Sequence, residues 1–309
     1  MTETTTHLSQ VIQQGWADHA DDAAGVFERL APALELVQAP EDLPGLAALI
    51  THVAGEHLGR WGEGLTLLEQ LAAHPACDLA SDPGRAVLRS QAVLQLGAGE
   101  LAAAEELLTR AHAGSPLPEA STRARVLAVT ASALAGQGRA GEAGRAFDEA
   151  LGLLSYGPGK DDPAARALAI TGNNLACELE ERAERSPEED ALLERAALAA
   201  RTWWEVAGSW NNVQIAEYRL AMTYLALGRP TSAAEHAAKC LELCRANAAG
   251  PGDLLFAHEV NARAAHAKGD QEAAQRERDL AHAALAEVGE GLRSYAEQTL
   301  NKLDAALAD

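Results

Sequence analysis

Residues 85–118 read RAVLRSQAVLQLGAGELAAAEELLTRAHAGSPLP, and the pattern of this stretch decides the fold. Apolar residues recur at helical spacing on both sides of Gly99, which predicts two amphipathic helices joined by a glycine turn. Ala104 is small at the place where the second helix has to cross the first closely. We expect the inward positions of the second helix to be Leu101, Leu107, Leu108 and Ala111.

The glycine turn of this helix pair recurs along the chain. In each copy, a large apolar or small residue stands two positions after the glycine, and a small residue stands three positions further on. The copies begin about 40 residues apart, with one gap of double length, at Gly59, Gly99, Gly138, Gly228 and Gly269. A fixed period of this size predicts a helical solenoid, in which each unit buries its apolar face by stacking on its neighbours.

The double-length gap contains a further, divergent helix pair. One helix is predicted over residues 164–185, and Ser186-Pro187-Glu188-Glu189 then combines an N-cap, an early proline and acidic residues, which is typical of a helix start. An earlier helix is predicted from about Leu46 to Leu58.

The predicted fold class is therefore all-α, with about six helical hairpins over residues 45–285. Residues 1–44 are expected to form N-terminal helices, and residues 290–309 a capping helix. We predict a single domain over residues 1–309. The segment 155–163 (SYGPGKDDP) could be a domain linker, but we interpret it as an inter-repeat loop because the period resumes beyond it.

Composition narrows the classes of function. Alanine dominates the hydrophobic residues, aromatic residues make up 4%, and runs of alternating β-branched residues are absent from the sequence, which favours helices. The formal net charge of −20, without a Lys/Arg cluster, argues against a nucleic-acid partner. The polar N-terminal stretch Met1–Gln10 does not resemble a signal peptide, and the chain lacks a membrane-length apolar run. Four cysteines without a Cys-x-x-Cys pair fit a reducing compartment, so we expect a cytoplasmic protein.

These residues resemble the tetratricopeptide repeat family. The stretch from Leu94 to Pro116 carries its pattern of glycine, bulky and small residues, and two more stretches match at Gly59–Pro75 and Ala221–Cys240. The long period is similar to that of the repeats of bacterial regulators and of kinesin light chains. The phrase Asn173-Asn174-Leu175-Ala176 resembles the first-helix motif of kinesin light chains. The resemblance implies a right-handed superhelix with a concave groove that holds a peptide, and it implies no catalysis.

Candidate groove contacts lie on adjacent first helices. A mid-helix asparagine offers both a donor and an acceptor to a peptide backbone. The predicted ligand-binding residues are Asn173, Asn174, Tyr218, Arg219, Met222 and Trp204. Some members of the family grip a terminal carboxylate with lysines, but the corresponding places here are Ala128 and Ile215, so this clamp is not expected.

Three tryptophans, Trp203, Trp204 and Trp210, crowd one stretch of a chain that is poor in aromatics. Trp203 and Trp204 point about 100° apart on a helix, so they cannot share one narrow core stripe. Either one of them is an exposed anchor for a partner, or the helix is covered on two sides.

Other polar groups have simpler interpretations. His236, Cys240 and Cys244 share one helix face, a combination that zinc can bind, but Cys240 occupies the small inward position of its unit. We therefore interpret it as a packing residue and predict neither a metal nor a cofactor. Glu178, Glu180 and Glu181 are expected to form a solvated or groove-edge acidic face, and Gly157–Lys160 lacks the spacing of a phosphate loop.

The predicted function is a protein- or peptide-binding scaffold or adaptor, not an enzyme. The acidic chain favours a neutral or basic partner. The alternative is a regulatory sensor that binds a small peptide or metabolite and signals through a separate partner. A homodimer formed through incompletely covered array ends is compatible with the sequence.

Overall fold

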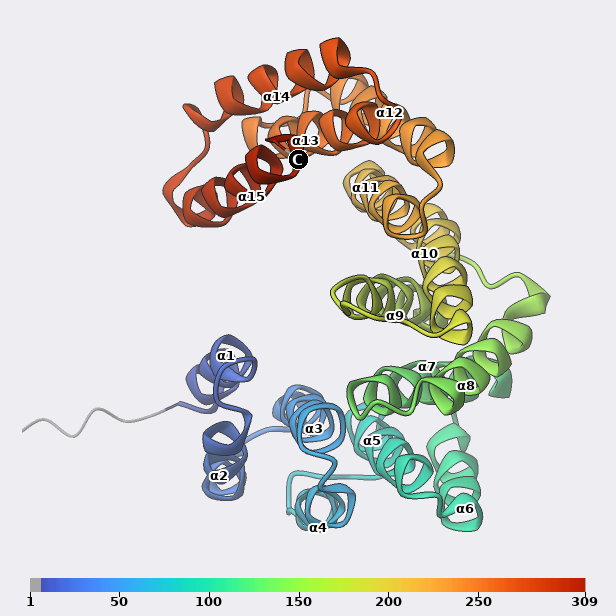
Figure 1. Cartoon of the computed structure of the whole chain (residues 1–309). Helices are drawn as coiled ribbons and strands as arrows, with labels where there is room; N and C mark the ends of the chain where they lie inside the picture. The colour runs from blue at the N-terminus through green and yellow to red at the C-terminus, as the bar shows by residue number, and fades with distance from the viewer. Residues whose placement is uncertain (1–6, 309) are drawn as a thin grey trace, which may run out of the picture. The chain divides into compact units, whose positions relative to one another are not determined.

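The computed structural model describes residues 7–308, and its regular elements over that range are helices (Figure 1). Residues 1–6 of the polar N-terminal stretch lie outside the described residues. No helix among the described residues is both long and apolar enough to cross a membrane. The α-helices are α1 Leu8–Asp18, α2 Ala23–Ala33, α3 Leu43–Thr51, α4 Trp61–Ala72, α5 Asp82–Ala98, α6 Leu101–His112, α7 Glu119–Gly136, α8 Ala140–Leu153, α9 Pro163–Glu180, α10 Pro187–Ala207, α11 Trp210–Ala226, α12 Pro230–Ala246, α13 Pro251–Ala267, α14 Gln271–Leu285 and α15 Glu290–Ala308.

Short helical segments complete the described elements. Three are 3-10 turns, η1 Leu34–Leu36, η2 Pro40–Asp42 and η4 Leu154–Tyr156. The fourth, η3 His52–His57, is a π-helix that continues directly from α3. The helix predicted from about Leu46 to Leu58 is thus an α-helix that changes to π geometry after Thr51.

The helices belong to two compact units. Unit 1 comprises Met1–Pro158 and Asp162–Ala167, and unit 2 comprises Gly159–Asp161 and Leu168–Asp309. The boundary falls within the segment 155–163 and just beyond it. The single domain predicted over residues 1–309 stays a prediction.

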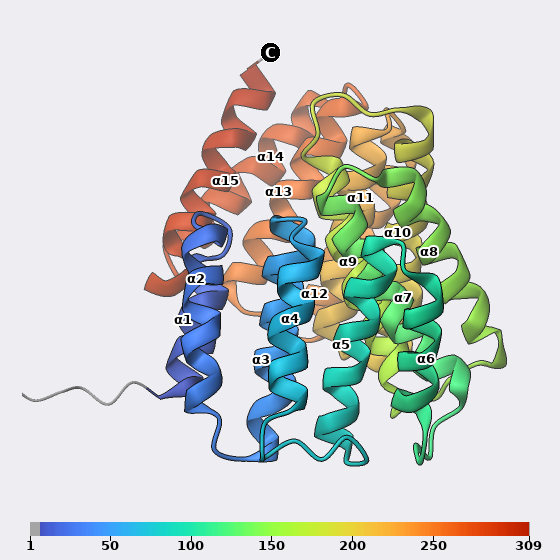
Figure 2. The ribbon, with the colours of Figure 1, turned by 90° about the horizontal axis from the view of Figure 1, so that it is seen from below.

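The order of elements confirms an all-helical array of hairpins. Six consecutive pairs run from α3/α4 to α13/α14, with α1 and α2 before them and α15 after them. In unit 1, the helices α3 to α6 lie side by side as neighbouring rods (Figure 2). The closest-packed hairpins are α5/α6, α7/α8, α11/α12 and α13/α14.

The hairpin turns explain the recurring glycines. All five phrase glycines have positive φ, between 60° and 87°. At Gly99, where φ is 87°, the N–H of Glu100 donates to the carbonyl of Gln95 at 2.9 Å and so closes the end of α5. Only glycine adopts this left-handed conformation without a steric cost, so the sequence requires it where two helices must reverse direction within a few residues.

Small residues mark the closest helix crossings, as predicted. Ala104 is fully buried, and so is Ala111 seven residues later on the same face of α6. The equivalent pairs in other hairpins are each at most 1% exposed: Ala143 and Ala150, Ala233 and Cys240, and Ala274 and Ala281.

The expected inward position of Leu101 is wrong. Its side chain is 65% exposed. Leu101 is the first residue of α6, and helical side chains tilt toward the N-terminus, so this side chain points past the end of the hairpin rather than between its helices.

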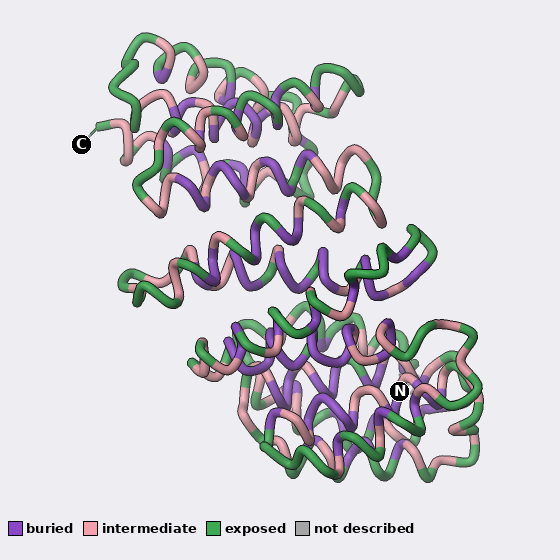
Figure 3. The backbone as a smooth tube through the Cα atoms, turned by 90° about the vertical axis from the view of Figure 1, so that its right-hand side faces the viewer, coloured by how far each residue is buried: buried purple, intermediate pink, exposed green. Residues whose placement is uncertain are grey.

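Buried residues follow the helices of both units (Figure 3), and the two cores differ in their residue composition. Unit 1 packs large aliphatic side chains, among them Leu43, Leu46, Leu49 and Ile50 of α3. Unit 2 is richer in alanine, and its C-terminal end is covered by α15, as predicted. The covering residues Ala296, Leu300 and Leu303 pack with Leu255, Ala262, Ala281 and Val288.

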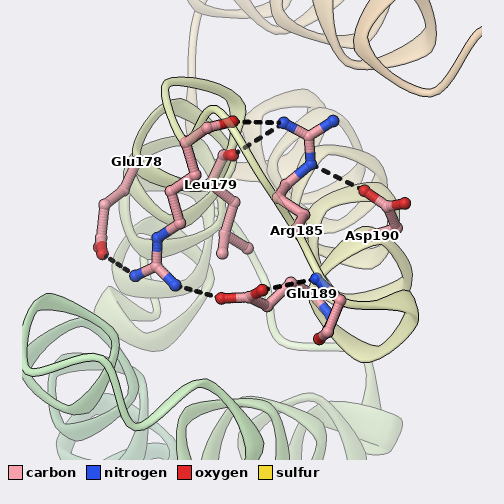
Figure 4. A network of polar contacts seen from close by, with 7 residues as sticks. Glu178, Leu179, Arg185, Glu189 and Asp190 are labelled. Carbon is pink, nitrogen blue, oxygen red and sulfur yellow. Dashed lines mark hydrogen bonds and ion pairs between the residues drawn. The ribbon is translucent and has the colours of Figure 1, made fainter.

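The divergent pair α9/α10 is joined by a polar network at its loop (Figure 4). Ser186 caps α10 as predicted, because its hydroxyl accepts from the N–H of Glu189 while the Glu189 carboxylate accepts from the N–H of Ser186. Arg182 donates to Glu178 and to Glu189, which links the two helices. Near the middle of α9, a Cβ on Gly172 would lie 2.6 Å from the carbonyl oxygen of Ala196, so the helices cross closely there.

Candidate functional site

The first helices of unit 2 carry polar side chains that repeat with the period of the array. Arg219 and Glu259 are 40 residues apart and lie near the middle of α11 and α13, whereas Glu180 is the last residue of α9. Residues three, four or seven positions apart share one face of a helix. We call this surface the first-helix face of unit 2, and it comprises Asn173, Cys177 and Glu180 of α9, Tyr218, Arg219 and Met222 of α11, and Glu259, Arg263 and His266 of α13.

An ion pair joins α9 to α11 on this face. Arg219 Nη1 donates to Glu180 Oε2 at 2.7 Å, and the two side chains are only 18% and 14% exposed. Burial raises the pKa of Glu180, and the neighbouring Arg219 partly opposes that rise. The expectation of a solvated acidic face therefore does not hold for Glu180.

A second charged group joins α11 to α13. The Glu259 side chain is fully buried, and the Tyr218 hydroxyl donates to its Oε2 at 3.1 Å while Arg263 donates to its Oε1. Burial raises the pKa of Glu259, and Arg263 opposes that rise. The face thus contains two carboxylates and two guanidinium groups, which balance each other inside a chain of net charge −20.

A cleft lies on the same face, next to these charges. Its volume is about 270 Å³, and its floor is formed by first helices while the C-terminal end of α15 contributes one wall. The lining residues are Glu180, Met222, Leu225, Ala226, Arg263, His266, Ala306 and Leu307. Charged side chains and apolar surface therefore meet in one concave place.

The structure brings most of the predicted contact residues to this face. Asn173, Tyr218, Arg219 and Met222 belong to it, and Met222 lines the cleft. The amide Nδ2 of Asn173 lies 3.9 Å from Cys177 Sγ, and its Oδ1 is buried without a hydrogen-bond partner. Asn174 is exposed, next to Asn173 on α9.

Trp204 lies elsewhere. It is 7% exposed and packs in a cluster with alanines of α9, α10 and α11, beside the half-buried Trp203. This arrangement matches the interpretation of a helix covered on two sides. The Trp204 side chain supplies packing between the helices, so we do not include it in the first-helix face.

The face also contains residues that sequence reasoning missed. Glu259 and Arg263 were not among the predicted contacts, although they are spaced four apart on one helix and Glu259 lies 40 residues after Arg219. Comparing charged positions at the repeat period is the signal that would have found them.

The histidine and cysteines of α12 have other partners. His236 Nδ1 lies 2.6 Å from Glu217 Oε2, Cys240 accepts from the side chain of Gln214, and Cys244 lies 3.7 Å from the carbonyl of Asp253. Cys240 fills the small inward position that Ala111 fills in α6. These contacts are those of packing residues.

Of three comparisons with known proteins, only the one with solved structures found matches. No family model matches the chain, and no curated protein matches it. Among solved structures, BtubC (BKLC) from P. vanneervenii is 16% identical, with 81% of this chain and 92% of that chain covered and a TM-score of 0.47. A tetratricopeptide repeat protein from Parabacteroides merdae is 13% identical, with 95% of this chain and 98% of that chain covered and a TM-score of 0.35.

Proposed function

We propose that the chain is a scaffold or adaptor, and that the first-helix face of unit 2 binds a segment of a protein partner. Two buried polar atoms carry the proposal: Asn173 Oδ1 and Arg219 Nε lack hydrogen-bond partners in the structure. Buried polar groups in proteins are nearly always satisfied. One is an acceptor and the other a donor, on adjacent first helices. Both atoms are buried in the free chain, so a peptide backbone would pair with them through its N–H and C=O only after these side chains shift outward.

The charges favour a neutral or basic segment. Within the face, Glu180 and Glu259 are balanced by Arg219 and Arg263, so the site itself attracts neither sign strongly. The rest of the chain supplies a negative field, which accelerates the approach of basic partners and repels acidic ones.

The test compares crosslinking from two positions on the face with crosslinking from one position outside it. A photocrosslinking amino acid replaces Asn173 or Met222, and the control replaces the exposed Lys239 on α12. We expect the same partner to crosslink from both face positions and not from the control. Partners that crosslink equally from all three positions would contradict the proposal.

Substitutions then separate binding from folding. The double variant Asn174→Ala with Arg219→Ala should lose capture of that partner while its helical circular dichroism is unchanged. Because Arg219→Ala leaves Glu180 unpaired, a second variant also carries Glu180→Ala. The matched control is Arg229→Ala with Glu194→Ala, which removes an ion pair of the same length, 2.7 Å, outside this face. Normal capture by the face variants would refute the assignment.

The cleft supports a second candidate, a sensor for a small peptide or metabolite. Ligand sites usually have volumes of about 300–1,000 Å³, and the cleft of about 270 Å³ lies close to that range. Since Ala306 and Leu307 line it, a ligand there would contact α15 directly. Ala306→Trp should fill the cleft and abolish the binding of a small ligand.

A further inference from the structure

Three histidines meet at one end of the N-terminal helices of unit 1. His19 follows α1, and His52 and His57 are the first and last residues of the π-helix η3. The ring centroids of the three imidazoles are 4.7 to 5.0 Å apart. Among the described residues 7–308, this is the one group of three or more potential ligands whose ligand atoms all lie within 4.8 Å of one another.

The π-helix brings two of these histidines together. In an α-helix, residues five apart differ by about 140° around the axis. In a π-helix, hydrogen bonds join residues five apart. Here, the N–H of Leu58 donates to the carbonyl of Val53 at 3.1 Å. His57 therefore lies next to His52 with the two rings edge to face, and their Nε2 atoms form a hydrogen bond at 3.1 Å.

Neighbouring acceptors orient the other ring nitrogens. His52 Nδ1 lies 3.0 Å from Glu56 Oε2, and His19 Nδ1 lies 2.8 Å from the carbonyl oxygen of Trp16. A carboxylate and a carbonyl can only accept, so each Nδ1 carries the proton and each Nε2 keeps its lone pair. A histidine whose second nitrogen donates to a carboxylate or carbonyl is the usual arrangement of a metal ligand.

We propose that His19, His52 and His57 bind one divalent transition-metal ion through imidazole nitrogens, with Zn²⁺ as the best match. Imidazole is a ligand for Zn²⁺, Cu²⁺ and Ni²⁺, and hard ions such as Mg²⁺ prefer oxygen. Zinc–nitrogen bonds of about 2.0–2.1 Å in tetrahedral geometry place two ligand nitrogens about 3.3–3.4 Å apart. The His52–His57 separation of 3.1 Å is close to this value, and a ring nitrogen of His19 lies within 4.8 Å of the ligand nitrogens of the other two histidines.

The site would join the end of α1 to the end of α3 and leave one coordination position open. Two of its ligands come from η3 and the third comes from the residue after α1, so the metal would close a loop of more than 30 residues. The fourth position is available to water or to a carboxylate of a partner. This inference concerns unit 1 and is independent of the function proposed for the first-helix face of unit 2.

The test uses untagged, full-length protein that has been stripped with a chelator. Isothermal titration with Zn²⁺ should show one equivalent bound, and Co²⁺ should give the visible absorption of tetrahedral or five-coordinate cobalt. His57→Ala should weaken Zn²⁺ binding at least tenfold, and His19→Ala should do the same, whereas His74→Ala should leave it unchanged. Glu56→Gln should weaken it about tenfold, because outer partners of ligands contribute 10–100-fold.

Fluorescence localises the metal without relying on affinity. The Trp16 ring lies 4.9 Å from the His52 ring, so bound Cu²⁺ should quench it, and Trp16→Phe should remove most of the quenching. His57 is exposed, so its alanine variant is expected to fold, and circular dichroism checks this. The proposal is overturned if no stoichiometric Zn²⁺ binds, or if binding survives in the triple His→Ala variant. It is also overturned if Cys240→Ala with Cys244→Ala, rather than the histidine variants, removes the metal.

Discussion

At the scale of single residues, the turn glycines have a cost that can be isolated. Gly99 has a φ of 87°, and a Cβ built there would have open space around it. Gly99→Ala should therefore lower the free energy of unfolding by about 1–2 kcal/mol through backbone strain alone. Gly152 in α8 has equally open space but helical geometry, so Gly152→Ala should raise stability by about 0.5 kcal/mol. Urea denaturation of both variants measures the difference, and equal effects of the same sign would refute the turn argument.

Two buried glutamates of unit 2 should respond to pH in opposite directions. Burial raises the pKa of Glu259 above its ordinary 4.5. Burial also acts on Glu217, but hydrogen bonds from His236 and Arg201 outweigh it and hold the pKa of Glu217 below 4.5. A carboxyl group whose pKa is raised by folding, such as Glu259, binds a proton more tightly in the folded state. The stability that it contributes is therefore lost as pH rises from 4.5 through its folded pKa. A carboxyl group whose pKa is lowered by folding, such as Glu217, contributes stability that is lost as pH falls below 4.5.

The measurement is the difference in unfolding free energy between each variant and the wild type as a function of pH. Relative to the wild type, Glu259→Gln should gain stability as pH rises above 4.5. The gain should be up to about 1.4 kcal/mol per pH unit between 4.5 and the folded pKa of Glu259. Glu217→Gln should show its pH-dependent change only below 4.5. If the two difference curves have the same sign and window, the assigned environments are wrong.

At the scale of helices, Arg185 holds the divergent pair in place (Figure 4). Its guanidinium donates to Asp190 at 2.7 Å, to the carbonyl of Arg182 at 3.1 Å and to the carbonyl of Ala226, at the end of α11, at 3.0 Å. The side chain is 13% exposed, so water replaces these partners poorly. Arg185→Ala should cost about 2–3 kcal/mol of stability. Arg276→Ala, at a side chain that is 61% exposed, should change it by less than about 0.5 kcal/mol.

Hydrogen exchange identifies where the Arg185 change acts. The ends of α9 and α11 should lose protection together in Arg185→Ala, because the guanidinium also donates to the carbonyl of Leu179, near the end of α9, at 3.3 Å. Protection in α5 and α6 should not change. Loss confined to the α9–α10 loop would contradict the bridging role.

Elements whose cause is local were predictable from the sequence. The left-handed turn at Gly99, the small residue at Ala104 and the cap at Ser186 each follow from a few neighbouring residues. The π geometry of η3 has no such local signature, because residues 52–57 also read as a regular helix. For that reason the histidine cluster was missed, and so was the burial of Glu180, which depends on Arg219 from another helix.

At the scale of the whole molecule, periodicity predicted six hairpins and a capping helix, because repetition averages out weak local signals. It could not predict which polar positions become buried. Glu259 and the exposed Asn174 both read as polar residues on first helices, and only the packing of neighbouring helix pairs within unit 2 distinguishes them. The division into two units depends on contacts among many residues. The segment 155–163 indicates only where along the chain the division falls.

The capping helix α15 covers the apolar end of the last hairpin. Leu300 is 1% exposed and packs with Leu255 and other residues of the last hairpin. A repeat array with an uncovered end exposes an apolar surface that binds other copies. Leu300→Ala should lower the free energy of unfolding by about 2–4 kcal/mol and should increase the apparent mass in light scattering as concentration rises. Leu292→Ala, at a side chain 39% exposed on the same helix, should do neither. If Leu300→Ala is destabilised yet has the same mass as the wild type at every concentration, α15 stabilises unit 2 without preventing association, and the capping argument fails.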